Sequence, residues 1–277
     1  MVACGAVAFA CPQPVPDLAR TPAVFAAGAF PLHSLQYPLA RRRFFVPTIH
    51  AGAAELRGDE ARHLARVLRA EPGQTYEISD NHSVYLAEIT EAHGDRVVFR
   101  AIEPLPAPDP PVRITLCAAL VKFDRFEWIV EKATELGVDQ IQPVETARSE
   151  KGLFEASRKR SERWVRIARE SSQQSRRVRV PDILPAQRFA AVLAHPAGHR
   201  YFLDEAEAAP FLRALPADRI PSATVALLIG PEGGWTDAER EAARSAGWRP
   251  VSLGPQILRA ETATAAAVAI LINAWIS

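Results

Sequence analysis

The sequence predicts a two-domain α/β protein in which a small β-barrel precedes a larger domain built on a mostly parallel sheet. Short strand-like runs, separated by Gly, Pro and Asp-Asn turns, fill residues 42–104 and favour a barrel. Five prolines fall within residues 104–111 and mark a linker over 105–111, because proline stiffens the chain and blocks regular structure. Over residues 112–277, strand-length apolar runs alternate with helical patterns, which is typical of helices packed on a parallel sheet.

Residues 1–41 differ in composition from the rest of the chain. They are rich in Ala and Pro, contain no lysine, and have a single arginine, Arg20, before Arg41. We expect an extension with little fixed structure, or a start codon placed too far upstream. A secretory signal is disfavoured, because residues 1–10 lack the basic side chains that precede the apolar core of such signals.

Strands and one helix are predicted in the barrel. The candidate strands cover residues 76–79, 84–89 and 97–102. Residues 59–68 have a helical pattern that places Leu64, Val67 and Leu68 on one face. We therefore expect this helix to plug or flank the barrel with that face.

The second domain contains the pattern of a parallel sheet with helices. Its candidate strands are residues 113–120, 140–144, 200–203, 224–229 and 250–253. A helix over residues 124–136 ends at Gly137, and its apolar side chains form one stripe: Phe126, Ile129, Val130, Ala133 and Leu136. The final helix, residues 262–275, is rich in Ala, which allows close packing against another element.

Composition excludes several classes of protein. A chain of 277 residues that is 48% hydrophobic can bury real cores, so a disordered chain is excluded. The net charge of +1 gives no global reason for nucleic-acid or membrane binding, so any basic surface must be local. No run of about 18 apolar residues exists, which excludes a membrane-spanning helix. Three scattered cysteines form no disulfide framework and favour a reducing, cytoplasmic setting.

No catalytic metal is predicted. His195 and His199 have the spacing of a metal-binding pair on a helix, but Pro196 and Gly198 lie between them and disfavour that helix. The chain has no Asp/Glu cluster or Cys pair that would supply other ligands.

Two glycine-containing turns near the end of the chain are the candidate ligand-binding loops. In residues 227–239 (LLIGPEGGWTDAE) a strand runs into a turn, and Thr236 with Glu239 makes a capping box for the next helix. Glycines at such a turn let the backbone approach a bound molecule, although a plain strand-to-helix turn has the same composition. Residues 253–263 (LGPQILRAETA) again join a strand to a helix. Neither turn matches a dinucleotide fingerprint or a P-loop.

Five motifs, in order and spacing, resemble the RsmE-type RNA methyltransferases of the SPOUT superfamily. They are residues 132–138 (KATELGV), Arg163-Trp164, Gln174-Ser175-x-Arg177, residues 229–234 (IGPEGG) and residues 253–263. The resemblance spans residue 42 to the C-terminus. The chain departs from the family in Trp235, where Phe is frequent, in Gln256, where Arg is common, and in the unmatched tail before Arg41.

The resemblance implies a fold, a reaction and partners. The fold is a PUA-like β-barrel over residues 42–104 followed by a SPOUT domain over residues 112–277, whose C-terminal segment threads a trefoil knot, a rare feature in proteins. The reaction is transfer of a methyl group from S-adenosylmethionine to N3 of a uridine in 16S rRNA, within the assembled 30S subunit. SPOUT domains work as homodimers, so residues 126–136 and the final helix are interface candidates, unless they pack internally.

The same resemblance assigns the cofactor contacts. They are Leu203, Ile229, Gly230, Pro231, Gly233, Gly234, Leu253, Gly254, Ile257, Leu258, Arg259 and Thr262.

The reaction itself points to catalytic residues. Uridine N3 is a poor nucleophile until it loses its proton, which leaves negative charge on N3, O2 and O4. A cation and a carboxylate are therefore expected beside the methyl group. We expect Arg259 to stabilise the uridine anion. Glu261 either accepts the N3 proton or orients Arg259, and Glu232 is the alternative for that role. Glu261 could instead cap the last helix.

A local excess of basic residues predicts the RNA-binding surface. Residues 158–179 carry nine basic side chains against Glu162 and Glu170, whereas ordinary solvated helices usually mix both signs. The candidate RNA contacts in this window and on the barrel are Arg42, Arg43, Arg62, Arg66, Arg158, Arg166, Arg169, Arg176 and Arg177.

Two alternatives remain open. A related SPOUT enzyme could methylate another RNA or a ribose 2′-OH, and a non-catalytic ribosome-binding assembly factor could keep the fold alone. The glycines of both turns and Arg259 disfavour the second alternative. Nucleoside analysis of the methylated RNA separates the first from the N3 reaction.

Overall fold

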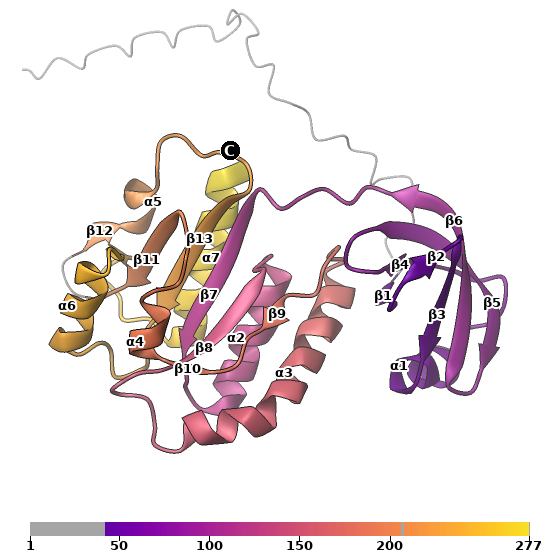
Figure 1. The fold of residues 1–277 in the computed structure, drawn as a ribbon, viewed down its shortest axis with the longest axis horizontal. Coiled ribbons are helices and arrows are strands. Elements are labelled where there is room, and N and C mark those ends of the chain that lie inside the picture. The colour runs from indigo at the N-terminus through magenta and orange to yellow at the C-terminus, as the bar shows by residue number, and fades with distance from the viewer. Residues whose placement is uncertain (1–41, 206–207, 277) are drawn as a thin grey trace, which may run out of the picture. The chain divides into compact units, whose positions relative to one another are not determined.

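The computed structural model describes residues 42–205 and 208–276. The expectations for residues 1–41 lie outside these residues. The described chain contains one six-stranded sheet and one eight-stranded sheet. Figure 1 shows both with their labels.

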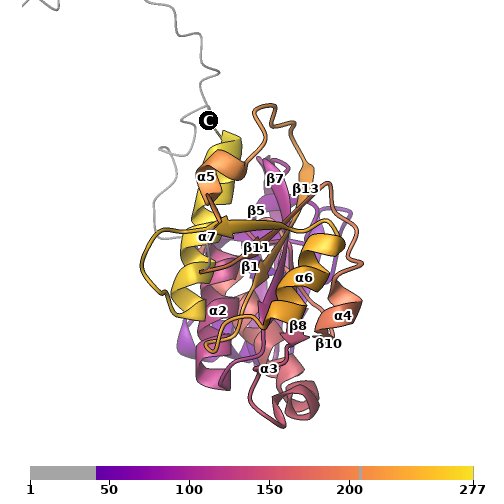
Figure 2. The same cartoon turned by 90° about the vertical axis from the view of Figure 1, so that its left-hand side faces the viewer.

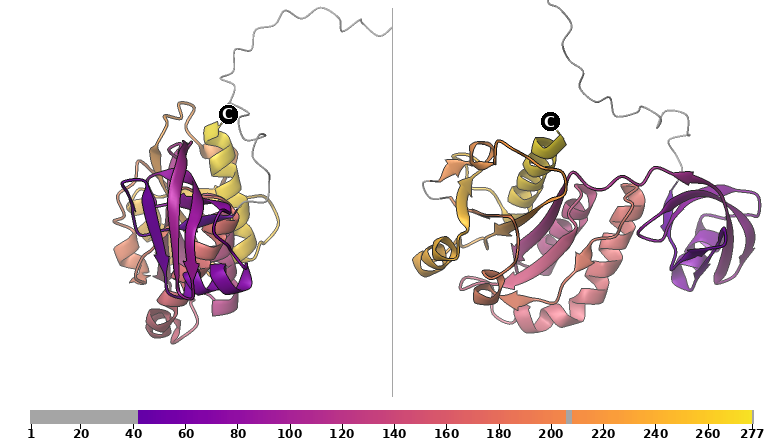
Figure 3. Two further views of the ribbon diagram at one scale, coloured as in Figure 1. Left: turned by 90° about the vertical axis from the view of Figure 1, so that its right-hand side faces the viewer. Right: turned by 45° about the horizontal axis from the view of Figure 1, so that its top comes forward.

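The first sheet forms a partly closed barrel. Its strands are β1 (Arg43–Phe45), β2 (Ile49–His50), β3 (Ala53–Arg57), β4 (Thr75–Ser79), β5 (Val84–His93) and β6 (Arg96–Leu105). Their order is β1-β4-β5-β6-β3-β2, and only the β1–β4 pair is parallel. The register shifts twice between β5 and β6, and such bulges increase the curl that Figure 3 shows. The three predicted strands are confirmed, and β5 and β6 extend further than expected.

The helix beside the barrel departs from the predicted pattern. Helix α1 (Asp59–Arg62) continues directly into the π-helix η2 (His63–Val67). The amide of Leu68 bonds to the carbonyl of His63, five residues back, which widens the turn and rotates the following side chains. Leu64 is buried as predicted, but the prediction for Val67 was wrong, since its side chain is 64% exposed.

The proline-rich residues connect the two sheets without regular structure. Strand β6 ends at Leu105, and the first strand of the second sheet begins at Val112. Prolines at this spacing remove backbone donors that a strand ladder needs, which accounts for the break.

The strands of the second sheet pair in parallel within the described residues. Its strands are β7 (Val112–Ala119), β8 (Gln140–Glu145), β9 (Asp182–Ile183), β10 (Gln187–Arg188), β11 (His199–Leu203), β12 (Ala209–Pro210), β13 (Ala223–Ile229) and β14 (Arg249–Ser252). The order is β10-β8-β7-β13-β11-β14-β12, with β9 paired to β8. All five predicted strands are confirmed, and they form the centre of this sheet.

Helices cover both faces of the second sheet. They are α2 (Phe123–Glu135), α3 (Leu153–Gln174), α4 (Phe189–Val192), α5 (Phe211–Ala214), α6 (Asp237–Ser245) and α7 (Ala260–Ile276). Figure 2 shows α2 and α7 on one side of the strands and α4 and α6 on the other. Alternate side chains of β13 therefore enter different cores: Leu227 packs with α2 and α7, and Leu228 packs with α4 and α6. This two-sided burial explains why β13 is apolar over most of its length.

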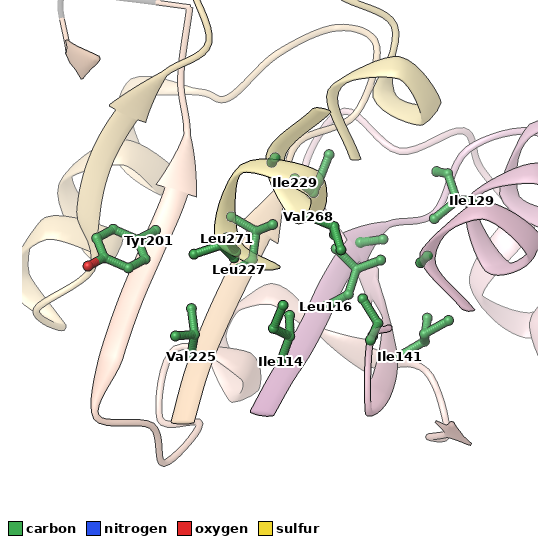
Figure 4. Close-up of a cluster of buried hydrophobic side chains, with 14 of the residues drawn as sticks. Ile114, Leu116, Ile129, Ile141, Tyr201, Val225, Leu227, Ile229, Val268 and Leu271 are labelled. Atoms are coloured by element: carbon green, nitrogen blue, oxygen red, sulfur yellow. The ribbon is translucent and has the colours of Figure 1, made fainter. Parts of the chain in front are cut away.

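The apolar stripes of α2 and α7 lie inside the chain. Phe126, Ile129, Val130 and Ala133 are fully buried, and Gly137 adopts φ 103° directly after α2. Leu271 of α7 completes the same core, which Figure 4 shows between the strands and both helices. These side chains pack internally, whereas Trp128 of α2 and Ile276 of α7 are exposed, so the expectation that both helices contribute to a dimer interface stays a prediction.

Candidate active site

Three neighbouring parallel strands end at one cavity. Strands β13, β11 and β14 lie side by side, and their carboxyl ends are Ile229, Leu203 and Ser252. Ligands of open α/β sheets bind beyond such carboxyl ends, where the following loops converge. Here the loops border an open cavity of about 190 Å³. The cofactor contacts inferred from the sequence that line it are Leu203, Ile229, Gly230, Pro231, Gly233, Gly234, Leu253, Gly254, Ile257 and Leu258.

Two inferred contacts lie elsewhere, and several lining residues were missed. Arg259 and Thr262 line a neighbouring cavity instead. The lining residues that sequence reasoning missed are Asp204, Glu205, Trp235, Ser252, Gln256, Ala260 and Ala263. Asp204 and Glu205 directly follow the strand that ends at Leu203, so the rule about carboxyl ends could have found them.

Trp235 supports the glycine-rich turn from behind. Its buried indole Nε1 donates to the carbonyl of Leu203 at 2.7 Å and so ties the end of β11 to the turn after β13. A Cβ added to Gly230 would lie 2.9 Å from Trp235 Cε2, which explains why this position carries no side chain. The residue that departs from the family pattern is therefore part of the wall of the cavity.

Further contacts hold the turn and the start of α6. The Thr236 hydroxyl accepts from the Glu239 amide, and Glu239 Oε2 accepts from the Thr236 amide, so the predicted capping box is confirmed. Glu239 Oε1 also accepts from the amide of Ala147 at 2.8 Å. Arg148 Nη1 donates to the carbonyl of Gly233 at 2.5 Å. The loop after β8 thus fixes the glycine-rich turn from outside.

Replacing Thr236 with Ala is expected to destabilise the fold by about 1 kcal/mol, the usual effect of losing an N-cap hydroxyl. The measurement is the midpoint of unfolding in urea, provided that the dependence of the unfolding free energy on urea concentration is unchanged. Thr236→Ser keeps the hydroxyl and serves as the control. An unchanged midpoint in Thr236→Ala would show that the capping box does not stabilise α6.

The lining of the cavity is apolar and acidic. Among the described residues that line it, three are carboxylates and none is basic. Asp204 is 5% exposed and pairs with Arg240 at 3.1 Å, and Arg240 also pairs with Glu205 at 3.0 Å. Glu232 forms an ion pair with Arg125 of α2. Such a lining suits a ligand that combines apolar surface with positive charge.

The first turn of α7 separates this cavity from its neighbour. Ala260 and Ala263 line the first cavity, whereas Arg259, Glu261 and Thr262 line the second. Glu261 Oε2 is buried and has no hydrogen-bond partner. That oxygen therefore caps no backbone amide of the helix.

Four of the arginines assigned to RNA contact the protein itself. Arg43 is 6% exposed and pairs with the buried Glu77, which also pairs with Arg176. Arg169 pairs with Glu60, and burial lowers the pKa of Arg177 to about 10. These side chains join the end of α3 to the barrel or to α2, so we withdraw them from the RNA surface.

The other candidate arginines remain at the surface. Arg42, Arg66, Arg158 and Arg166 are exposed, and they form no ion pair within the part of the chain that the structure describes. Arg62 is exposed and pairs with Asp59. These positions retain the charge that a phosphate backbone needs.

No group of His, Cys, Asp and Glu suitable for a metal ion occurs in residues 42–205 and 208–276. In the same residues, no helix is long and apolar enough to span a membrane.

Two family models match the chain. A model described as an RNA methyltransferase domain matches residues 108–272, and one described as an RNA methyltransferase PUA domain matches residues 56–102.

Among curated relatives, the ribosomal RNA small subunit methyltransferase E of Synechocystis is 33% identical over 90% of this chain and 82% of its own length. The protein of the same name from Bacillus subtilis is 30% identical over 74% of this chain and 84% of its own length.

Solved structures are similar over most of the chain. The ribosomal RNA small subunit methyltransferase E of Neisseria gonorrhoeae, bound to S-adenosyl methionine, is 31% identical with a TM-score of 0.75, covering 83% of this chain and 96% of that one. A putative methyltransferase from Legionella pneumophila, solved with the same cofactor, is 28% identical with a TM-score of 0.76 over the same shares.

Proposed function

Because the chain belongs to the ribosomal RNA small subunit methyltransferase E family, we propose that it methylates N3 of one uridine in 16S rRNA, with S-adenosylmethionine as the donor. The product is 3-methyluridine. The observation that carries this proposal is the cavity at the carboxyl ends of β11, β13 and β14, with Arg259 and Glu261 next to it.

The residues that line the cavity suit the chemical groups of the donor. Ile229, Leu253 and Leu258 offer apolar surface to the adenine ring, and the turn at Gly230 brings backbone within reach. The donor carries a sulfonium and an ammonium group, which suit the three carboxylates of the lining. Arg240 and Arg125 offset part of that negative charge. When bound, it supplies an electrophilic methyl group. The exposed Ile257 lies at the rim of the cavity.

The acceptor needs a base and a cation, and the structure favours one assignment. Glu261 has a buried oxygen without a partner, so it can accept the N3 proton. Glu232 is already engaged by Arg125 and is the weaker candidate. Arg259, at the start of α7, stabilises the negative charge that develops on the uracil oxygens.

The exposed arginines of α3 and the barrel form the proposed RNA surface. We assign phosphate contacts to Arg42, Arg62, Arg66, Arg158 and Arg166.

Reversing two of these charges is expected to weaken RNA binding and its dependence on salt. Each phosphate contact contributes roughly 0.7–0.9 to the slope of log K against log salt concentration, so Arg158→Glu with Arg166→Glu should lower the slope by about 1.5. The measurement is a binding titration with 16S RNA at several salt concentrations. The matched control reverses Arg213 and Arg244, which are exposed on α5 and α6. An equal loss in both double variants would contradict the assignment.

The substrate and the assembly belong to the same proposal. The target is the RNA within the assembled 30S subunit, and the enzyme acts in the cytoplasm as a homodimer.

The trefoil knot is also part of the proposal. Strand β14 pairs with β11 on the side away from β13, whereas α7 returns to contact β7 and β13. This return of α7 to the centre of the sheet supports the proposed knot.

The test is an assay of purified chain with donor labelled in the methyl group, using 30S subunits and naked 16S RNA as substrates. Digestion to nucleosides should release the label as 3-methyluridine, with 30S subunits as the better substrate. Label in a 2′-O-methyl nucleoside would identify the ribose reaction instead. Donor binding without transfer to either substrate would favour a non-catalytic assembly factor.

A further inference from the structure

A second cavity adjoins the proposed donor site. It is open to solvent and measures about 690 Å³. Its walls are Asp124, Arg125 and Trp128 from α2, and Arg259, Glu261 and Thr262 from the start of α7.

The two cavities are joined by adjacent residues and by an ion pair. Leu258 lines the first cavity and Arg259 the second. Arg125 of the second cavity pairs with Glu232 of the glycine-rich turn, which lines the first. A group held in the second cavity would therefore lie beside the donor.

Trp128 gives the second cavity an aromatic surface. Its side chain is 41% exposed, whereas Trp164, Trp235 and Trp248 are at most 2% exposed and Trp275 is 8% exposed. Lys132 Nζ lies 5.8 Å from the Trp128 ring centroid. An exposed indole with a cation nearby is a common platform for an unstacked nucleic-acid base.

Glu261 gives the cavity a polar group without a partner. Its buried Oε2 needs a hydrogen-bond donor, because a buried unpaired acceptor is costly. The N3–H of uracil is such a donor. Cytosine has a lone pair at N3 and would face the carboxylate with repulsion.

We propose that this cavity receives a single unpaired uracil base, stacked on Trp128 with N3–H directed to Glu261. This inference rests on the proposed function and deepens it. The base must leave its own stack to enter, as bases do in other enzymes that modify them. Trp128 is then a positioning and specificity residue, and Glu261 selects uracil against cytosine.

The test compares Trp128→Ala with Trp128→Phe. Loss of the stacking surface is expected to lower kcat/KM for 30S subunits roughly 5- to 150-fold in Trp128→Ala, corresponding to the ~1–3 kcal/mol of one stacked base. Trp128→Phe keeps an aromatic face and should stay within a few-fold of the wild type. Donor affinity and the thermal unfolding midpoint should be unchanged in both variants.

Two further measurements keep the outcomes distinct. Sedimentation of each variant reports whether a second copy of the chain covers Trp128. Dissociation of the homodimer that parallels the loss of activity in Trp128→Ala would overturn the base pocket. Ultraviolet crosslinking of RNA with 5-iodouridine at the target position should label Trp128 in the wild type. Full activity of Trp128→Ala would overturn the inference alone, whereas absence of methyl transfer by the wild type would overturn the proposed function.

Discussion

Replacing Arg259 with Ala is expected to lower kcat for methyl transfer by roughly 10²–10³-fold, the usual effect of removing one group that stabilises a developing oxyanion. Arg259 lines the cavity beside the donor site and not the donor site itself. Donor affinity should therefore stay within a few-fold of the wild type. The measurement is single-turnover transfer to 30S subunits, with donor binding measured separately by calorimetry.

Arg259→Lys is the matched control, because it keeps the charge but loses the planar fork of the guanidinium. It should recover part of the lost rate. Near-normal turnover in Arg259→Ala would remove Arg259 from the mechanism, and loss of donor binding would reassign it to the donor site.

Replacing Gly230 with Ala is expected to weaken donor binding by up to about 100-fold. The added Cβ would lie 2.9 Å from the Trp235 ring, and overpacking of this kind typically costs ~1–3 kcal/mol. Displacement of Trp235 also disturbs the carbonyl of Leu203, which its indole holds. The measurement is a calorimetric titration with S-adenosylmethionine.

Two variants make the Gly230 test specific. Gly198→Ala is the control, because its Cβ would meet its nearest neighbour, the Thr224 carbonyl oxygen, at 3.4 Å, far from the donor site. Trp235→Phe in the Gly230→Ala background leaves more room and should restore part of the affinity. Unchanged affinity in Gly230→Ala would contradict the position of the donor against this turn.

The sheets and the donor loops could be predicted because their signals are local. Buried parallel strands are apolar throughout, and glycines followed by a capping box mark the turn before α6. The resemblance to the RsmE-type methyltransferases then supplied most of the residues that line the first cavity. Sequence reasoning missed Trp235 as a wall residue, because the contact of its indole with Leu203 joins positions 32 residues apart.

The remaining features depend on contacts that no local pattern reveals. The basic window suggested an RNA surface, but Arg176 reaches Glu77, which lies 99 residues away in the chain. The π-helical turn beside the barrel rotates the side chains that follow it, and amino-acid composition does not predict such a turn. The second cavity required α2 and the start of α7 to meet, so Trp128 had no visible role in the sequence.

A crystal structure of the chain with S-adenosylhomocysteine tests the central claim most directly. The adenine should lie among Leu203, Gly230 and Leu253, and the sulfur should face the cavity that holds Arg259 and Glu261. Density for the ligand elsewhere on the chain, or a sulfur directed away from Arg259, would contradict both the donor site and the mechanism built on it.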